Sequence, residues 1–429
     1  MKIALVNPPQ PYLITPKTQV PLGLLYLSAI VKQNTTHAVD LKECSTLTID
    51  DAANQMGAYD IYGFTATSLD YGTQLSLSRK LRAKHGGLHI IGGPHASVMP
   101  EETLTDGFDC VFVGEAELSF LKFLCNLQER SVQKMYKQRK LTDLNAIPRP
   151  DRDSFPWVGG NVLTSGNKPS VNIMASRGCP FNCAFCASET IWHRKLRWRY
   201  VDDVVDEIKE CIDKYGTKVV RFSDDNMLSN RKWTERFCDL VKPLGIKWRL
   251  SVRVDAVEPN IIKQMAEAGC AELGLGCESF DPTVLHKLNK KITPEQSLRA
   301  INVCHDAGIG ARLLMMINTP GETYKRTVDL NQEALESVRG KFCYLSFKIF
   351  MPLPGTPIWD YPDDYHIKIL SRDFSRYNFY MYRADRGETK VSFWSPIAIN
   401  GMTFEQQRKN VEDTFERART FPEMADGTL

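Results

Sequence analysis

Three cysteines stand close together in one turn-rich stretch of the chain. Cys179, Cys183 and Cys186 have the spacing C-x-x-x-C-x-x-C. Thiolates are the preferred protein ligands of iron–sulfur clusters, and so compact a loop can bring all three around one cube. Three ligands on a four-iron cluster leave one iron open, and an open metal position can bind and activate a second molecule. The spacing therefore predicts a [4Fe–4S] cluster with one free corner.

The same thiols allow two other interpretations. A zinc ion needs a fourth ligand, and His193 is the nearest candidate in the sequence, but structural zinc ligands usually arrive as two pairs. The thiols can also simply be buried side by side. A zinc-stabilised binding module is therefore the non-enzymatic alternative, whereas disulfides are not expected in a reducing compartment.

The cysteine loop follows the first of a series of β-rich segments that alternate with helical patterns. Strands are predicted over residues 170–175, 218–222, 247–252, 271–275, 311–317 and 344–350. Helices are predicted over residues 201–215, 232–241, 259–268, 294–307, 324–338 and 403–419. Six β/α units in series predict a partial (β/α)6 barrel, a fold that keeps its chemistry at the carboxyl ends of its strands.

The beginning of the chain has the pattern of a separate α/β domain. Strands are predicted over residues 2–6, 38–41, 61–64, 89–91 and 110–113, with helices over 22–31, 71–84 and 117–127. This order predicts a flavodoxin-like doubly wound sheet, which binds ligands beyond the carboxyl ends of its strands. The predicted domains are 1–130 for this sheet, 131–168 for a linker, 169–358 for the barrel and 359–429 for a carboxyl-terminal extension.

Composition narrows the class of protein. The 429 residues are 43% hydrophobic and 24% charged, which excludes a mostly disordered chain. A formal net charge of +3 provides no overall electrostatic footprint for nucleic acid. No apolar run reaches the roughly 18 residues of a membrane span, and the apolar start is too short for a signal peptide. We therefore expect a cytoplasmic protein. Its isolated cysteines are predicted to be small buried hydrophobes: Cys44, Cys110, Cys125, Cys211, Cys238, Cys270, Cys304 and Cys343.

The cysteine motif, with Phe185 before its last cysteine, resembles the signature of the radical S-adenosylmethionine superfamily. The resemblance covers most of the chain. The stretches 7–9, 21–24, 91–97 and 114–117 are similar to a cobalamin-binding-type amino-terminal domain, and 222–226, 253–255, 274–279, 320–323 and 352–357 are similar to barrel motifs. Relatives by pattern include hopanoid methylases and the anaerobic magnesium-protoporphyrin ester cyclase.

The resemblance implies roles for individual residues. The three cysteines would hold the cluster, whose open iron would chelate the amino and carboxylate groups of S-adenosylmethionine. Reduction would then release a 5′-deoxyadenosyl radical. Phe185 would lie near the adenine, Asp224 and Asp225 would accept hydrogen bonds from the methionine ammonium, and Arg253 would pair with its carboxylate. Glu278 would bind the ribose hydroxyls, and the adenine would lie between Pro320 and Gly321.

Each of these residues also has an ordinary structural interpretation. Asp225 can cap a helix, Arg253 can form a surface pair with Asp255, and Pro320-Gly321 can make a turn. Polar residues at the ends of successive barrel strands nevertheless favour a shared site. The chain departs from the family pattern at Cys277, where an apolar residue is common, and at Asn318-Thr319, where a glycine is usual.

The resemblance also implies a cobalamin site in the first domain. Its candidate residues follow four of the predicted strands: Asn7, Pro8, Thr65, Thr67, Ser68, Gly92, Gly93, His95, Gly114 and Glu115. The loop after the first strand has no histidine, so cobalt cannot take a ligand from it. His95 is expected to be a loop residue rather than a cobalt ligand, and glycines 92 and 93 would let the backbone approach the nucleotide tail.

These implications together predict a radical enzyme that methylates an unactivated carbon of a small molecule or natural product with the help of cobalamin. Oxidative cyclisation or rearrangement without methyl transfer is the alternative. A flavodoxin or ferredoxin would supply the electron. No further C-x-x-C pair follows Cys186, which argues against auxiliary clusters. The cysteine spacing of the amino-terminal domain does not supply the second cluster expected of methylthiotransferases for transfer RNA, and the near-neutral charge also argues against a nucleic-acid substrate. The tail aromatics could cover a substrate or simply pack: Tyr377, Phe379, Tyr380, Tyr382 and Trp394.

Overall fold

The computed structural model describes residues 1–10, 16, 20–138, 143–155, 169–374 and 395–418. The five tail aromatics named above lie outside these ranges. The chain divides into two compact units. In the described ranges, the first unit holds residues up to 155 with 190–193 and 373–374, and the second holds 169–189, 194–372 and 395–418. None of the helices in these ranges has both the length and the apolar character that crossing a bilayer requires.

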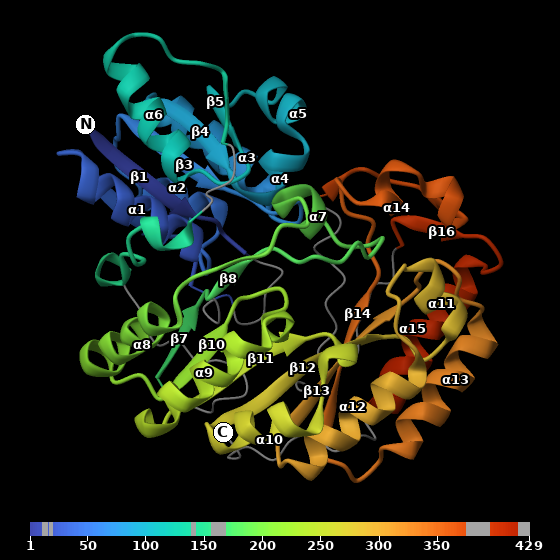
Figure 1. Ribbon diagram of the computed structural model, residues 1–429. Coiled ribbons are helices and arrows are strands. Elements are labelled where there is room, and N and C mark those ends of the chain that lie inside the picture. Colours follow the sequence, from blue (N-terminus) through green and yellow to red (C-terminus); the bar gives the residue numbers. More distant parts are fainter. Residues whose placement is uncertain (11–15, 17–19, 139–142, 156–168, 375–394, 419–429) are drawn as a thin grey trace. The chain divides into compact units, whose positions relative to one another are not determined.

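The first unit is built on a parallel sheet with the strand order β2-β1-β3-β4-β5-β6 (Figure 1). Its strands are β1 (Lys2–Asn7), β2 (Ala38–Glu43), β3 (Ile61–Thr65), β4 (Leu88–Gly92), β5 (Cys110–Val113) and β6 (Met135–Lys137). Its helices are α1 (Leu22–Asn34), α2 (Ile49–Gln55), α3 (Tyr71–His85), α4 (Gly93–Val98), α5 (Pro100–Thr105) and α6 (Glu117–Gln128). The predicted flavodoxin-like arrangement is confirmed.

Strand β1 shows why this sheet must be covered on both faces. Ile3 and Leu5 belong to a buried apolar cluster that includes side chains of α1 and α6. Ala4 and Val6 belong to a second cluster, which includes side chains of α2 and α3. Successive side chains of a strand point to opposite faces, so a strand that is apolar throughout needs helices on both sides.

Three features of the first unit differ from the sequence-based expectations. The stretch from residue 131, predicted as a linker, contains β6, which adds a sixth strand to the sheet. Residues 93–98 form α4, so His95 is a helix residue and not the predicted loop residue. Cys125 is exposed on α6, whereas the seven other isolated cysteines are buried as predicted.

The second unit contains a parallel sheet with the order β14-β13-β12-β11-β10-β7, the predicted partial (β/α)6 barrel (Figure 1). Its strands are β7 (Ser170–Ile173), β10 (Val219–Phe222), β11 (Lys247–Val252), β12 (Cys270–Glu278), β13 (Gly310–Ile317) and β14 (Cys343–Ile349). Two short antiparallel pairs accompany it: β8 (Ser176–Arg177) with β9 (Arg197–Trp198), and β15 (Ile367–Ile369) with β16 (Ile397–Ile399).

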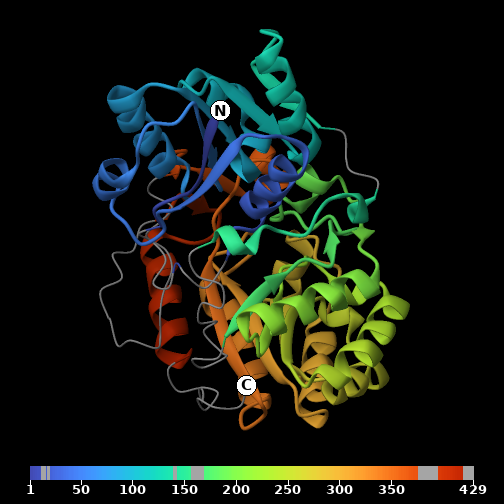
Figure 2. The same cartoon turned by 90° about the vertical axis from the view of Figure 1, so that its left-hand side faces the viewer.

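Helices follow the strands of this sheet along the chain. They are α8 (Val201–Tyr215), α9 (Arg231–Val241), α10 (Pro259–Glu267), α11 (Pro282–Lys287), α12 (Pro294–Asp306), α13 (Tyr324–Ser337), α14 (Pro357–Asp360) and α15 (Phe404–Ala418), with the short α7 (Ser188–Trp192) after the cysteine loop. Helix α12 begins with a complete capping box, in which Thr293 and Gln296 each bond the backbone N–H of the other. In Figure 2, α15 runs beside the edge of the sheet that carries β13 and β14.

A buried polar network connects the end of β13 to α15. Asn318 has φ +59°, a left-handed conformation that favours glycine and that asparagine tolerates better than most residues, which accounts for the departure from the family pattern here. Its backbone N–H donates to Glu322 Oε2 at 2.9 Å, and Asn410 Nδ2 on α15 donates to the same oxygen at 2.8 Å. Thr319 Oγ1 donates to Glu322 Oε1 at 2.8 Å. The carboxyl group of Glu322 therefore holds the turn after β13 and α15 together.

This network predicts a pH-dependent contribution to stability. Burial raises the pKa of Glu322 to about 7, although the bonds from Thr319, Asn318 and Asn410 oppose the shift. The folded chain then holds this proton more tightly than the unfolded chain. The contribution of Glu322 to stability is complete below the unfolded pKa of 4.5 and declines as the pH rises through 7. The decline amounts to about 3 kcal/mol, the free-energy equivalent of the shift.

The measurement is urea unfolding of the wild-type chain and of Glu322→Gln between pH 4.5 and 8. We expect the difference in unfolding free energy between the two chains to move in favour of the glutamine variant as the pH rises. Glu333→Gln, on the exposed face of α13, is the control and is expected to change little. A constant difference across this pH range would contradict the assignment.

Candidate active site at the strand ends of the second unit

The cysteine loop connects β8 to α7 and is fixed to a distant segment by hydrogen bonds. Ala184 N–H donates to the Leu288 carbonyl at 2.8 Å, and Asn289 Nδ2 donates to the Asn182 carbonyl at 2.8 Å. Ala184 is buried in an apolar cluster with Leu288 and Ile358. The loop is therefore held by the chain around it, as precise placement of ligands requires.

The three thiols of the loop lie close enough to influence one another. All three are partly exposed. Burial raises the pKa of Cys186 to about 11, and the negative charges of Asp225, Cys183 and Cys179 add to the effect. Burial also raises the pKa of Cys179, with Asp225 and Cys183 contributing. Without a cation Cys179 and Cys186 therefore stay protonated at neutral pH, and bound iron would ionise them.

Arg253 connects the end of β11 to the cysteine loop. Its guanidinium Nη1 lies 3.6 Å from Cys183 Sγ, and its carbon lies 3.7 Å from the centre of the Phe181 ring. The guanidinium also donates to both oxygens of Asp255, at 3.0 and 2.9 Å, and to the Lys290 carbonyl at 2.7 Å. The predicted pair with Asp255 is therefore present, but Arg253 is 5% exposed and faces the cysteine loop rather than the surface.

Glu278 occupies a strained position at the end of β12. Its φ is +62°, a left-handed value that is rare for a side chain of this size, and the register with β13 shifts between Gly276 and Glu278. Lys290 Nζ donates to Glu278 Oε1 at 2.8 Å and lies 5.7 Å from the centre of the Phe185 ring. A side chain at Gly276 would place its Cβ 2.9 Å from that ammonium group. Strain of this kind concentrates at functional sites.

The two aspartates after β10 differ in their environments. The carboxylate of Asp224 is buried and accepts bonds from Ala175 N–H at 3.1 Å, from Ser176 Oγ at 2.5 Å and from Ser176 N–H. Burial raises the pKa of Asp224 to about 6. Asp225 is exposed and accepts a bond from Ser188 Oγ at 2.7 Å. Asp224 thus fixes the backbone after β7, whereas Asp225 acts on the thiols electrostatically.

The other predicted residues of this site are Pro320 and Gly321, in the turn after β13, and Phe185, in the cysteine loop; Cys277 in β12 is one departure from the family pattern. Pro320 is buried, and Gly321 has φ +88°; a Cβ on Gly321 would lie only 3.0 Å from Lys287 Cγ. Cys277 is fully buried, and burial raises its thiol pKa to about 12, so it behaves as the apolar residue usual at this position. Phe185 packs against the apolar cluster around Ala184.

The structure thus joins Arg253 to the cysteine loop by direct contacts, and Lys290 lies between Glu278 and Phe185 of the loop. Sequence reasoning missed Lys290, because it follows a helix rather than a strand and carries no motif. It also missed Phe181, whose place within the motif was the available signal. No group of three or more His, Cys, Asp or Glu side chains in the described part of the chain, the loop cysteines included, is already arranged as the ligand set of a metal ion.

In the first unit, the predicted cobalamin residues follow β1, β3, β4 and β5, which are neighbours in the sheet and end at one edge. Asn7 Nδ2 donates to Glu43 Oε2 at 2.7 Å, and Pro8 is buried next to it. The Thr65 carbonyl accepts a bond from Gln74 at 2.8 Å, and the Thr67 N–H donates to Asp70 at 2.6 Å. The predicted clustering of these residues at one sheet edge is therefore present.

The turns at this edge depend on glycine. Gly93 has φ +90°, and a Cβ there would lie 2.6 Å from Thr65 Oγ1. Gly114 has φ +81°, its N–H donates to Ser97 Oγ at 3.0 Å, and Glu115 beside it is buried. Gly92 ends β4 and precedes the first turn of α4. At Gly93 the missing side chain thus leaves room for Thr65, whereas a Cβ at Gly114 would meet only the Gln138 carbonyl oxygen, at 3.7 Å.

His95 is buried inside the first unit. Its ring stacks on Tyr71 with 3.9 Å between ring centres and meets Phe374 edge-on at 5.4 Å. Its Nδ1 lies 3.0 Å from Ser68 Oγ, and its Nε2 has no hydrogen-bond partner among the described residues. Burial lowers the pKa of His95 to about 4, so the ring is neutral at neutral pH.

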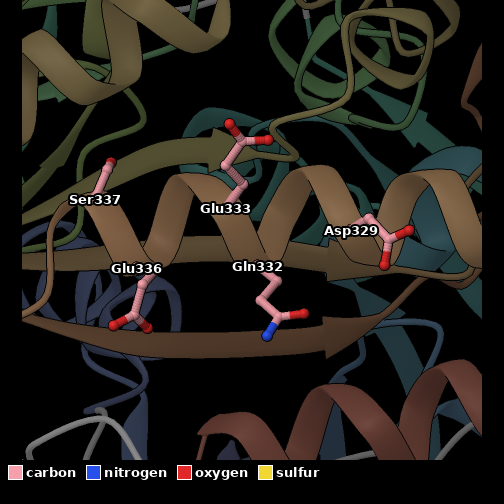
Figure 3. A pocket seen from close by; sticks show the side chains of 5 residues that line it. All are labelled: Asp329, Gln332, Glu333, Glu336 and Ser337. Atoms are coloured by element: carbon pink, nitrogen blue, oxygen red, sulfur yellow. The ribbon is translucent and has the colours of Figure 1, made fainter.

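A further pocket lies along one face of α13 (Figure 3). Its lining consists of Asp329, Gln332, Glu333, Glu336 and Ser337. These residues recur at the spacing of one side of a helix. The pocket therefore includes none of the strand-end residues described above.

Comparisons with known proteins decide the family. A model of the radical SAM superfamily matches residues 173–334, and a model of the B12 binding domain matches residues 15–124. An uncharacterized methyltransferase of Pyrococcus horikoshii is 30% identical over 84% of this chain and 83% of its own length. This chain belongs to the radical S-adenosylmethionine superfamily. Both the family and the enzyme class predicted from the sequence are confirmed.

Other known proteins are similar to this chain over most of its length. A bacteriochlorophyllide d C-12(1)-methyltransferase of Chlorobaculum tepidum is 23% identical over 85% of this chain and 77% of its own length. The fold resembles the radical SAM methyltransferase TsrM of Kitasatospora setae, solved with cobalamin and a [4Fe–4S] cluster, with a TM-score of 0.66, 15% identity and coverage of 83% and 73% of the two chains. The predicted fold class of this radical SAM protein is thereby confirmed.

Proposed function

We propose that this protein methylates an unactivated carbon of a small molecule or natural product, using a [4Fe–4S] cluster, S-adenosylmethionine and cobalamin. The observation that carries the proposal is the contact of Cys183 with Arg253, which ties the thiol loop to the end of a barrel strand. The donor set fits the cluster, because three partly exposed thiols in one loop leave one iron of the cube open. Cys179, Cys183 and Cys186 would hold the cluster, which when bound would supply the electron for cleavage of the carbon–sulfur bond of S-adenosylmethionine.

The protein's own residues would bind and orient S-adenosylmethionine. We assign the methionine carboxylate to Arg253 and the methionine ammonium to Asp225, which is the more accessible of the two aspartates. Asp224 positions the cysteine loop through residues 175 and 176. Glu278, with its charge balanced by Lys290, is assigned to the ribose hydroxyls. Phe185, Pro320 and Gly321 supply apolar and close-packed surface for the adenine.

Cobalamin is assigned to the carboxyl-edge residues of the first unit. This edge has turns at Gly93 and Gly114, whose positive φ values are rare for residues that carry a side chain. It also has the buried, neutral imidazole of His95, whose Nε2 makes no hydrogen bond among the described residues. These features fit a large polar ligand that approaches the backbone closely. Cobalamin supplies a methyl group that a substrate radical can accept. We further assign the reductant to a flavodoxin or ferredoxin and the compartment to the cytoplasm.

The test begins with anaerobic reconstitution. We expect iron and sulfide at about four each per chain, an electron paramagnetic resonance signal after reduction, and uptake of a corrinoid visible by absorbance. With substrate, the product is expected to gain one methylene in mass. A chain that takes up a cluster but never a corrinoid would contradict the methylase assignment, and zinc without iron would contradict the radical assignment.

A second candidate function is oxidative cyclisation without methyl transfer. It is favoured by one relative, the anaerobic magnesium-protoporphyrin IX monomethyl ester cyclase of Rubrivivax gelatinosus, which is 24% identical over 75% of this chain and 61% of its own length. Product mass separates the two functions, because cyclisation removes hydrogens or adds oxygen, whereas methylation adds a methylene.

The assignment of Arg253 leads to a quantitative prediction. Arg253→Lys keeps the positive charge but loses the planar guanidinium, whose Nη2 donates both to Asp255 and to the Lys290 carbonyl. We expect cleavage of S-adenosylmethionine to fall roughly 10- to 100-fold, the usual effect of disturbing a residue that orients a metal site. The control is Arg236→Lys, an exposed residue that pairs with Asp202.

The readouts are KM for S-adenosylmethionine, kcat and the resonance spectrum of the cluster. A contact with the methionine carboxylate predicts a raised KM and a changed spectrum on addition of S-adenosylmethionine. Unchanged KM and spectrum, with only a lower melting temperature, would assign Arg253 a purely structural role.

A further inference from the structure

The two faces of the second-unit sheet carry different kinds of side chain. Phe222 and Trp248 meet Phe237 of α9 with 5.3 and 5.2 Å between ring centres, so this face lies under the helices. Successive side chains of a strand point to opposite faces, so Arg221 and Arg249 project into the barrel interior. The interior of this barrel is therefore charged where its outer layer is aromatic.

Strand register extends this interior face across the sheet. Arg221 pairs with Arg249, and Arg249 pairs with Glu272. Two residues further along β12, Gly274 pairs with Arg312 of β13, and further along β13 Met316 pairs with Lys348 of β14. Paired residues of neighbouring parallel strands project to the same face. Cationic side chains from β10, β11, β13 and β14 thus share one interior.

One buried carboxylate lies between two of these cations. Glu272 is fully buried and lies 3.2 Å from Arg249 Nη1 and 3.3 Å from Arg312 Nε, so one carboxylate serves two guanidinium groups. Glu278 is paired with Lys290. Lys348 makes no hydrogen bond or ion pair with any residue in the described ranges. The surrounding protein atoms partly desolvate the Lys348 ammonium, although solvent still reaches the side chain. This desolvation and the charges of Arg312 and Arg221 lower the pKa of Lys348, while Glu278 opposes the shift.

Two of these cations are accessible to a solute. Gly274 lets Arg312 approach the backbone of β12, because a Cβ at Gly274 would lie only 3.1 Å from Arg312 Nη2. Lys348 is exposed, and the Arg312 side chain is 21% exposed, so a solute can reach both. Like charges that are gathered and left accessible are stabilised by a bound anion.

We propose that Arg312 and Lys348 bind an anionic group of the substrate, a carboxylate or phosphate, inside the barrel. The proposal rests on the proposed function and deepens it by naming the substrate class. A planar guanidinium suits an oxyanion by paired hydrogen bonds, and the ammonium adds a point charge from the neighbouring strand. Lys348 is the last residue but one of β14, and Glu278 is the last residue of β12, so both lie near the carboxyl ends of parallel strands. The anion would therefore orient the substrate next to the residues assigned to S-adenosylmethionine.

The test is calorimetric binding of inorganic phosphate and, separately, of succinate to the full chain. We expect the wild-type chain to bind at least one of them. Lys348→Met and Arg312→Met are each expected to weaken binding roughly tenfold or more, the effect of losing one hydrogen bond to a charged group. Lys348→Arg, which keeps the charge, is expected to retain binding. Tighter binding of phosphate assigns a phosphate ester, and tighter binding of succinate assigns a carboxylate.

The matched control is Lys247→Met, at the exposed first residue of β11 and with the same change of charge. Absence of binding, or equal weakening by Lys247→Met and Lys348→Met, would overturn the proposal. In the cluster-loaded chain, saturating S-adenosylmethionine is expected to leave phosphate binding intact, and competition between them would overturn a substrate site. These binding measurements need no turnover. Failure to bind an anion would therefore count against the interior site alone, whereas absence of a cluster or of methyl transfer would count against the proposed function.

Discussion

Replacement of any one of Cys179, Cys183 and Cys186 by alanine is expected to abolish cleavage of S-adenosylmethionine. Three thiolates hold three irons of the cube and leave the fourth iron open, and the loop has no further cysteine to replace a lost ligand. Because the cluster carries out the chemistry and the protein only binds and orients, the expected loss is on the order of 10⁴-fold or more. Anaerobic production of 5′-deoxyadenosine, measured beside iron content, checks this result.

The control for these variants is Cys125→Ala, which removes an exposed thiol of α6. It is expected to keep full iron content and activity. Circular dichroism separates loss of the cluster from loss of the fold, because the loop is held by bonds to residues 288 and 289 that alanine does not disturb. Turnover that survives in all three alanine variants would remove the basis of the proposed function.

Some elements of the fold can be predicted from the sequence, because the spacing of their apolar residues and the residues at their ends indicate the same bounds. Helix α8 has the predicted bounds Val201–Tyr215, since its apolar positions repeat at helical spacing and Gly216 ends it in a left-handed conformation. Strand β12 is longer than predicted, spanning Cys270–Glu278 instead of 271–275. Glycines and a terminal glutamate interrupt its apolar pattern, and only tertiary packing reveals that all nine residues are buried.

The candidate site is predictable only to the level of strand ends. The sequence places Arg253 and Glu278 after neighbouring strands, and parallel strands end at one edge, so their proximity can be anticipated. It cannot reveal that Lys290, from a loop between two helices, pairs with Glu278 and accepts a bond from Arg253 at its carbonyl. Nor can it separate Asp224, whose carboxylate is occupied by backbone hydrogen bonds, from its exposed neighbour Asp225. Contacts between segments distant in sequence decide both points.

Glu272→Gln is expected to destabilise the chain strongly. The substitution keeps the size of the side chain but removes the carboxylate that lies between the guanidinium groups of Arg249 and Arg312. Removing one partner of a buried ion pair typically costs about 3–5 kcal/mol. Urea unfolding is the measurement. Glu267→Gln, which breaks the exposed pair with Lys242, is the control and is expected to leave the unfolding midpoint unchanged.

Glu272→Gln also distinguishes a structural ion pair from a ligand-binding interior. Removing one negative charge raises the positive potential around Arg312 and Lys348, so the folded variant is expected to bind the preferred anion more tightly than the wild-type chain does. Bound anion in turn offsets part of the lost stability, because a ligand that binds only the folded chain stabilises it by mass action. A structural pair alone predicts the loss of stability without either effect. Stability that falls and does not recover with anion would therefore argue against the interior site while leaving the cluster chemistry untouched.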